Sequence, residues 1–112
     1  MDPLAESWFE SISRWWLLEA GLPRPRLQVP FTDAHGRVRA RVDMLVGRVV
    51  GEADGALKYD DPAAILAEKQ REDWLRDVHR LEVVRWIPAE MGSPAGRAEV
   101  VARFTRAAAR AR

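Results

Sequence analysis

The sequence predicts an α/β fold in which a four-stranded mixed sheet is flanked by helices, in the order α-β-β-β-α-β-α. Apolar residues recur at helical spacing in three segments, one near each end of the chain and one in the middle. Between these segments lie short runs in which apolar and polar residues alternate, as they do in half-buried strands. The last run follows the middle helix, and a strand reached through a crossover helix implies a mixed sheet with helices packed on it.

The first helix is expected over residues 3–20. Its apolar positions follow helical spacing and are Leu4, Trp8, Ile12, Trp15, Trp16 and Leu18. The sequence Gly21-Leu22-Pro23 then supplies a C-cap glycine and a helix breaker, so the helix should end there.

Three consecutive short strands are expected after this helix. Residues 27–31 alternate apolar and polar side chains, and residues 33–36 form a turn. Residues 37–44 have a period of two, which places one set of side chains toward the core and the other on a polar face. The apolar set is Val38, Ala40, Val42 and Met44, and the polar set is Arg39, Arg41 and Asp43. After a break near Gly47, residues 48–54 form the third strand, so the three strands make a meander.

The second half of the chain predicts a helix, a strand and a final helix. Helical spacing extends over residues 62–78, with Asp60, Asp61 or both as N-cap candidates before a proline in the first turn. Residues 81–87 are then expected to form a fourth strand, and residues 94–110 the closing helix.

Length and composition limit the class of protein. With 112 residues the chain has the size of one domain, which we take as residues 1–112. It has no cysteine, which excludes a disulfide framework and a thiolate zinc site. No apolar run reaches the roughly 20 residues of a membrane span, and the N-terminus lacks the features of a signal peptide. We therefore expect a cytoplasmic protein without a membrane partner.

Three carboxylates stand at the end of the second predicted strand and in the third: Asp43, Glu52 and Asp54. Glu52 and Asp54 project from the same face of their strand, and a hairpin would bring Asp43 alongside Glu52. Close carboxylates repel each other unless they share a proton or a cation. Mg²⁺ is bound by one or two carboxylates with water and phosphate oxygens, so the pattern indicates a metal site acting on phosphate. The alternative is that these acids form ion pairs on an exposed face with Arg39, Arg41 and Arg48.

Several short motifs follow one another along residues 7–91. They are Glu10-Ser11-Ile12-Ser13-Arg14, Ala20-Gly21-Leu22-Pro23 with Leu27-Gln28-Val29-Pro30, Arg41-Val42-Asp43-Met44, Val50-Gly51-Glu52-Ala53-Asp54-Gly55 with Lys58-Tyr59, Glu68-Lys69-Gln70-Arg71-Glu72-Asp73, and Val84-Arg85-Trp86. With the order of elements given above, these motifs make the chain resemble the PD-(D/E)XK nuclease superfamily, whose fold has a restriction-endonuclease-like core. It looks most like the small very-short-patch-repair-endonuclease-like domains of actinobacteria. In those proteins the domain often follows an N-terminal winged helix and is associated with AbiEi-type antitoxins.

The resemblance implies a Mg²⁺-dependent endonuclease, with Asp43 and Glu52 as the ligands of Mg²⁺ or Mn²⁺. It also implies Glu10, on the first helix, as an additional acid at the site. The expected partner is nucleic acid, and DNA in particular, whose phosphodiester bonds a metal-activated water would attack. No winged-helix candidate precedes the first helix, so the part that supplies sequence specificity in the relatives is not expected here.

The chain departs from the superfamily pattern at one position. The pattern has lysine two residues after the acid, and this chain has Asp54 there. The lysines of the chain are Lys58 and Lys69. Lys58 is closer to Glu52 along the chain, whereas Lys69 lies on the following helix, from which other members of the superfamily supply theirs. Either is a candidate for orienting water or stabilising the transition state.

Two alternatives to the nuclease stay open at this point. The domain would be a catalytically inactive nucleic-acid-binding or antitoxin-associated regulatory module if the absent lysine marks lost chemistry. It would be a protein-interaction domain if its terminal helices form a homodimer. Arg71, Arg76 and Arg85 are candidates for contacts to nucleic-acid phosphate, although ion pairs to Glu68, Glu72 and Asp77 would explain them as well.

Overall fold

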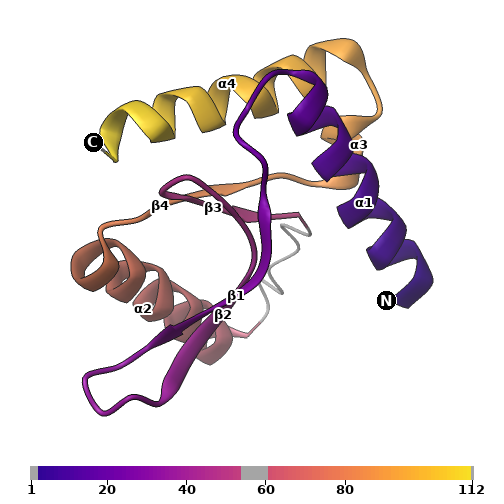
Figure 1. The fold of residues 1–112 in the computed structure, drawn as a ribbon. Helices are drawn as coiled ribbons and strands as arrows, with labels where there is room; N and C mark the ends of the chain where they lie inside the picture. Colours follow the sequence, from indigo (N-terminus) through magenta and orange to yellow (C-terminus); the bar gives the residue numbers. More distant parts are fainter. Residues whose placement is uncertain (1–2, 54–60, 112) are drawn as a thin grey trace.

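The chain folds into a four-stranded sheet covered by helices on both faces (Figure 1). The computed structural model describes residues 3–53 and 61–111. The helices are α1 (Pro3–Glu19), α2 (Pro62–His79), α3 (Pro88–Met91) and α4 (Pro94–Arg110), and the strands are β1 (Arg26–Thr32), β2 (Val38–Val46), β3 (Val49–Glu52) and β4 (Glu82–Arg85). The strands lie in the order β1-β2-β3-β4, and all neighbours are antiparallel except the parallel pair β3 and β4. The predicted mixed sheet and order of elements are confirmed, with the single turn of α3 as an addition.

Local sequence signals define the two hairpin turns. In the β1–β2 connection, Asp33 Oδ1 accepts hydrogen bonds from the backbone N–H of His35 at 2.9 Å and of Arg37 at 3.1 Å. The β2–β3 connection needs a left-handed residue, and Gly47 supplies it with a φ of 61°. The second turn matters for the site, because it sets the register between the strands that carry Asp43 and Glu52.

The ends of α2 are also fixed by local chemistry. Asp61 is the N-cap, since its Oδ1 accepts from the backbone N–H of Ala63 at 3.1 Å and of Ala64 at 3.3 Å. Pro62 occupies the first turn, where its missing N–H costs nothing. The helix ends at Arg80, which adopts a left-handed conformation with a φ of 56°. A glycine is more usual at such a position.

Two apolar clusters, one on each face of the sheet, join the layers. The cluster on the side of α1 and α4 contains Leu17, Met44, Val46, Val49, Ala53, Val84, Trp86, Met91, Val100, Phe104 and Ala107. The cluster on the side of α2 contains Val29, Ala40, Val42, Leu45, Val50, Leu75 and Leu81. In the part of the chain that the structure describes, no helix combines the length and apolar character needed to cross a membrane.

One predicted core face is wrong, namely the common face of Val38, Ala40, Val42 and Met44. Val38 is 53% exposed, and Met44 belongs to the cluster beneath α1 and α4, whereas the other two face α2. Leu45 rejoins the cluster facing α2, so the alternation of β2 shifts by one residue beside Asp43. The neighbouring strand is distorted at the same level, because Gln28 has a φ of 50° within β1. In the β1–β2 pair, the alternation of side chains between the two faces therefore shifts by one residue at Asp43, the candidate metal ligand. We call this shift the change of phase.

Gly51 leaves room for two aromatic rings against β3. A Cβ at this position would lie 3.0 Å from Trp86 Cη2 and 3.1 Å from Phe104 Cζ. Trp86 cannot easily move, because its Nε1 donates a hydrogen bond of 2.9 Å to the buried Ser13 Oγ. We expect Gly51→Ala to lower the free energy of unfolding by about 1–3 kcal/mol through overpacking, measured by urea denaturation. Gly92→Ala is the control, since a Cβ there meets only an ordinary contact at 3.5 Å; an equal loss in both variants would contradict the packing explanation.

Candidate metal centre

Asp43 and Glu52 come from adjacent strands and lie next to each other at the end of the β2–β3 hairpin. Met44 pairs with Gly51 in this ladder, and one further step along it sets Asp43 against Glu52. The two side chains interact both by charge and by a side-chain hydrogen bond. The hairpin thus brings the two carboxylates together, as the predicted strand pairing requires.

Glu52 is the more buried of the two acids, with 9% of its surface exposed. Burial raises the pKa of Glu52 to about 7, Arg71 opposes this rise, and the nearby charge and hydrogen bond of Asp43 add to it. Near neutral pH the pair is therefore poised to share a proton or to exchange that proton for a cation.

Arg71, on α2, is the cation that faces this pair. Its Nη1 lies 3.1 Å from Glu52 Oε1 and 3.1 Å from Glu68 Oε1, and its Nη2 donates to the carbonyl oxygen of Arg41 at 3.0 Å. The contact to Glu52 lacks hydrogen-bond alignment, so Glu52 Oε1 is buried with no hydrogen-bond partner in the described structure. A buried carboxylate oxygen left in this state is costly, and a further ligand would relieve the cost.

The predicted phosphate-binding arginines are engaged with acids. Arg85 Nη2 forms a short ion pair with Glu68, and its Nη1 lies 3.8 Å from Glu72. Arg76 lies 3.7 Å from Glu72 and 3.2 Å from Glu82, whereas Asp77 forms no ion pair with any described residue. Ion pairs therefore explain these arginines through Glu68 and Glu72, as the alternative proposed. Among the described residues Asp77 takes no part, and Glu82 pairs with Arg76 in addition.

Glu10 and Asp43 line one small hollow between α1 and the β1–β2 ladder. Its volume is about 130 Å³, and its lining is Glu10, Arg14, Leu27, Gln28, Asp43 and Met44. The structure therefore places Glu10 on the side of Asp43 that faces α1, while Glu52 lies on the side that faces α2. Asp43 thus neighbours Glu52 and also borders the hollow that Glu10 lines.

Gln28 lies between the paired residues Leu27 and Val29 of β1, which places it opposite Asp43. Its left-handed backbone disfavours any residue with a Cβ, and such strain is often kept at functional sites. We expect Gln28→Gly to be more stable than Gln28→Ala by about 1 kcal/mol, because both variants lose the side chain and only glycine relieves the backbone. Urea denaturation of the two variants measures this difference, and equal stability would show that the conformation is unstrained.

Of the three remaining predicted site residues, the structure describes only Lys69. Asp54 and Lys58 lie outside the described residues. Lys69 is exposed on α2, and residues two apart on a helix do not share a face, so Lys69 points away from the direction of Arg71. The structure brings an arginine, and not this lysine, to the acid pair.

The alternative of surface ion pairs between the acids and Arg39, Arg41 and Arg48 is not what the structure shows for the described residues. Arg39 stacks on Trp74 with its Cζ 4.7 Å from the ring centre, and Arg48 donates to backbone carbonyl groups. Arg41 contributes its carbonyl oxygen to Arg71. The counter-ion of Glu52 comes instead from a helix nearly twenty residues further along the chain, which neighbouring charges in the sequence do not indicate.

The acid pair supplies two of the oxygen ligands that a hard divalent cation takes. Residues 3–53 and 61–111 contain no group of three or more His, Asp or Glu side chains gathered at metal-binding distances. They do contain two adjacent carboxylates, one with a buried oxygen lacking a hydrogen-bond partner. Mg²⁺ is commonly held by one or two carboxylates and completes its shell with water and phosphate oxygens. Asp43 and Glu52 are the residues that would hold it.

Comparisons of the chain with family models, with curated proteins and with solved structures returned no match.

Proposed function

We propose that this chain is a metal-dependent nuclease domain of the PD-(D/E)XK type that hydrolyses phosphodiester bonds in DNA. The observation that carries the proposal is the contact between Asp43 and Glu52, in which a buried Glu52 oxygen lacks a hydrogen-bond partner. The order of elements, α-β-β-β-α-β, is the one expected for this class. Mg²⁺ or Mn²⁺ is the cofactor that this pair of acids suits.

Each residue of the site has a separate task in this proposal. A bound Mg²⁺ would activate water and neutralise charge on the phosphate. Asp43 and Glu52 supply its negative ligands, and Glu10 shapes the far side of the hollow that Asp43 lines. Arg71 lies beside Glu52, where its guanidinium group can donate hydrogen bonds to phosphate oxygens. It therefore joins Lys58 as a candidate for the role of the missing lysine and takes precedence over Lys69, which points away from the acid pair.

One observation favours a second candidate, a nucleic-acid-binding or antitoxin-associated module without catalysis. Arg71 already supplies Glu52 with a positive charge at 3.1 Å, and an arginine in that place balances the acid without a metal. A domain that had lost its chemistry would be expected to keep such an ion pair, because an unpaired buried acid is destabilising.

Incubation of the protein with supercoiled plasmid distinguishes these functions. The nuclease predicts nicking with Mg²⁺ or Mn²⁺ and none with EDTA. Binding that weakens steeply with added salt but produces no nicks would support the inactive module. Neither binding nor nicking would contradict both and leave the protein-interaction domain.

A further inference from the structure

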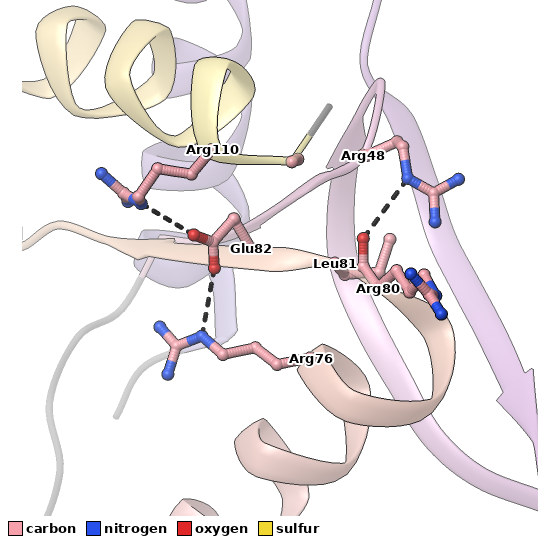
Figure 2. A pocket seen from close by; sticks show the side chains of 7 residues that line it. Arg48, Arg76, Arg80, Leu81, Glu82 and Arg110 are labelled. Atoms are coloured by element: carbon pink, nitrogen blue, oxygen red, sulfur yellow. Dashed lines mark hydrogen bonds and ion pairs between the residues drawn. The ribbon is translucent and has the colours of Figure 1, made fainter.

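A second polar site lies at the opposite end of β4 from Asp43 and Glu52. Glu52 pairs with Arg85, whereas the hollow surrounds Glu82, three residues earlier on the strand and so roughly 10 Å away. The hollow measures about 650 Å³. Its lining is Arg48, Arg76, Arg80, Leu81, Glu82, Arg110 and Ala111, and we call it the arginine pocket. Figure 2 shows that its arginines come from the β2–β3 turn, from α2 with its C-cap residue and from the end of α4.

Internal contacts use only part of the hydrogen-bonding capacity of these arginines. Arg110 and Arg76 hold Glu82 from two sides, through Nε atoms 2.7 Å and 3.2 Å from its carboxylate oxygens (Figure 2). These arginines keep the pKa of Glu82 below its usual range. Arg48 donates to the carbonyl oxygens of His79 at 2.8 Å and Arg80 at 3.3 Å. Since each guanidinium group carries five N–H donors, most donors of the pocket are left for solvent or a ligand.

The charge of the pocket exceeds what its own surroundings neutralise. Four arginines and one glutamate line it, which leaves three positive charges in excess. The carboxyl ends of α2 and α4 lie here, and each contributes roughly half a negative charge through the helix dipole. Arg76 also pairs with Glu72 at 3.7 Å, so about one positive charge stays uncompensated. Capping of helix ends explains Arg48, but it does not explain all four arginines.

Arg80 is the residue that internal structure explains least. Its side chain is exposed and forms no hydrogen bond or ion pair with any other described residue. Its backbone is left-handed, with a φ of 56°, at a helix end where glycine fits without strain. The chain thus places a free guanidinium group at the rim of a basic pocket, at a position that disfavours any side chain with a Cβ.

We infer that the arginine pocket binds a phosphate group, with Arg80 as a principal contact. Guanidinium groups suit this ligand because their planar forks donate paired hydrogen bonds to phosphate oxygens. The phosphate belongs either to a small phosphorylated compound or to the backbone of a nucleic acid. The inference does not rest on the nuclease proposal, since none of its residues belongs to the acid pair.

Pyrophosphate is the first probe, titrated by calorimetry at constant ionic strength into the full chain. We expect saturable binding that weakens about tenfold or more in both Arg80→Gly and Arg80→Ala, because each removes a charge-assisted contact. The glycine variant should be the more stable of the two, so a shared loss of binding cannot be attributed to unfolding. Arg37→Ala is the control, because Arg37 is exposed at the β1–β2 turn and lies outside the pocket.

Absence of pyrophosphate binding at 10 mM, or an equal loss in Arg37→Ala, would overturn the inference. A short DNA duplex then identifies the source of the phosphate. If the pocket holds a nucleic-acid backbone, Arg80→Gly should weaken duplex binding and reduce its salt slope by about one. If duplex binding is unchanged while pyrophosphate binding is lost, the pocket takes a small phosphorylated compound. None of these variants changes Asp43 or Glu52. A negative result would therefore overturn the phosphate pocket without bearing on the proposed nuclease, which the plasmid assay tests.

Discussion

Replacing Asp43 by asparagine is expected to lower Mg²⁺-dependent plasmid nicking by about 100-fold or more. The substitution keeps the size of the side chain but removes one of the two negative ligands, and a loss of about 3 kcal/mol in transition-state stabilisation corresponds to that factor. Unfolding would not explain the loss. The negative charge of Asp43 disfavours the ionised form of Glu52, so removing that charge should not destabilise the fold. Initial rates of conversion of supercoiled to open-circular plasmid provide the measurement.

Asp77→Asn is the matched control for this experiment. Asp77 is exposed on α2 and forms no ion pair with a described residue, so the variant removes the same charge away from the acid pair. Its nicking rate should stay within about twofold of wild type, as is usual for a surface substitution. Equal activity of the Asp43 and Asp77 variants would show that Asp43 is not a ligand.

The second large effect concerns stability and pH in the presence of EDTA. Because the pKa of Glu52 is raised from 4.5 to about 7, the folded chain holds a proton that the unfolded chain releases. This group therefore stabilises the fold fully below pH 4.5, and its contribution is lost as pH rises to about 7. The corresponding loss in the free energy of unfolding is on the order of 3 kcal/mol.

Glu52→Gln should remove this dependence, since glutamine is neutral at every pH. We expect the variant to be more stable than wild type at pH 8 and close to it at pH 4.5, in urea denaturation at a series of pH values. Glu19→Gln, on an exposed position at the end of α1, should keep the wild-type pH profile. A wild-type stability that rises between pH 5 and pH 7 relative to Glu52→Gln would contradict the protonated state of Glu52.

Much of the fold was predictable because its signals are local. Asp61 before Pro62 marks the start of α2, and Gly47 marks the hairpin turn, since a side-chain cap and a left-handed glycine act within a few residues. The hairpin pairing of β2 and β3 then sufficed to bring Asp43 alongside Glu52, although the alternation predicted for β2 fails beside Asp43. The single turn of α3 was missed, because four residues are too few to show helical periodicity.

The rest of the site depends on packing between distant segments. Arg71 reaches Glu52 only because α2 lies against that face of the sheet, and the nearest sequence partner of Arg71 is Glu68, three residues away on the same helix. The change of phase at Asp43 involves Gln28, a residue whose left-handed backbone no composition rule predicts. The arginine pocket likewise gathers residues from position 48 to position 111. Such contacts follow from the assembled layers and not from any single segment.

Calorimetric titration of Mn²⁺ at pH 8 tests whether Asp43 and Glu52 together form a divalent metal site. We expect one Mn²⁺ per chain, with binding abolished in Asp43→Asn and Glu52→Gln and retained in Asp77→Asn. Binding should also weaken as pH falls below about 7, because a proton on Glu52 competes with the metal. No binding at millimolar Mn²⁺, or equal binding by the Asp43 variant, would contradict the assignment.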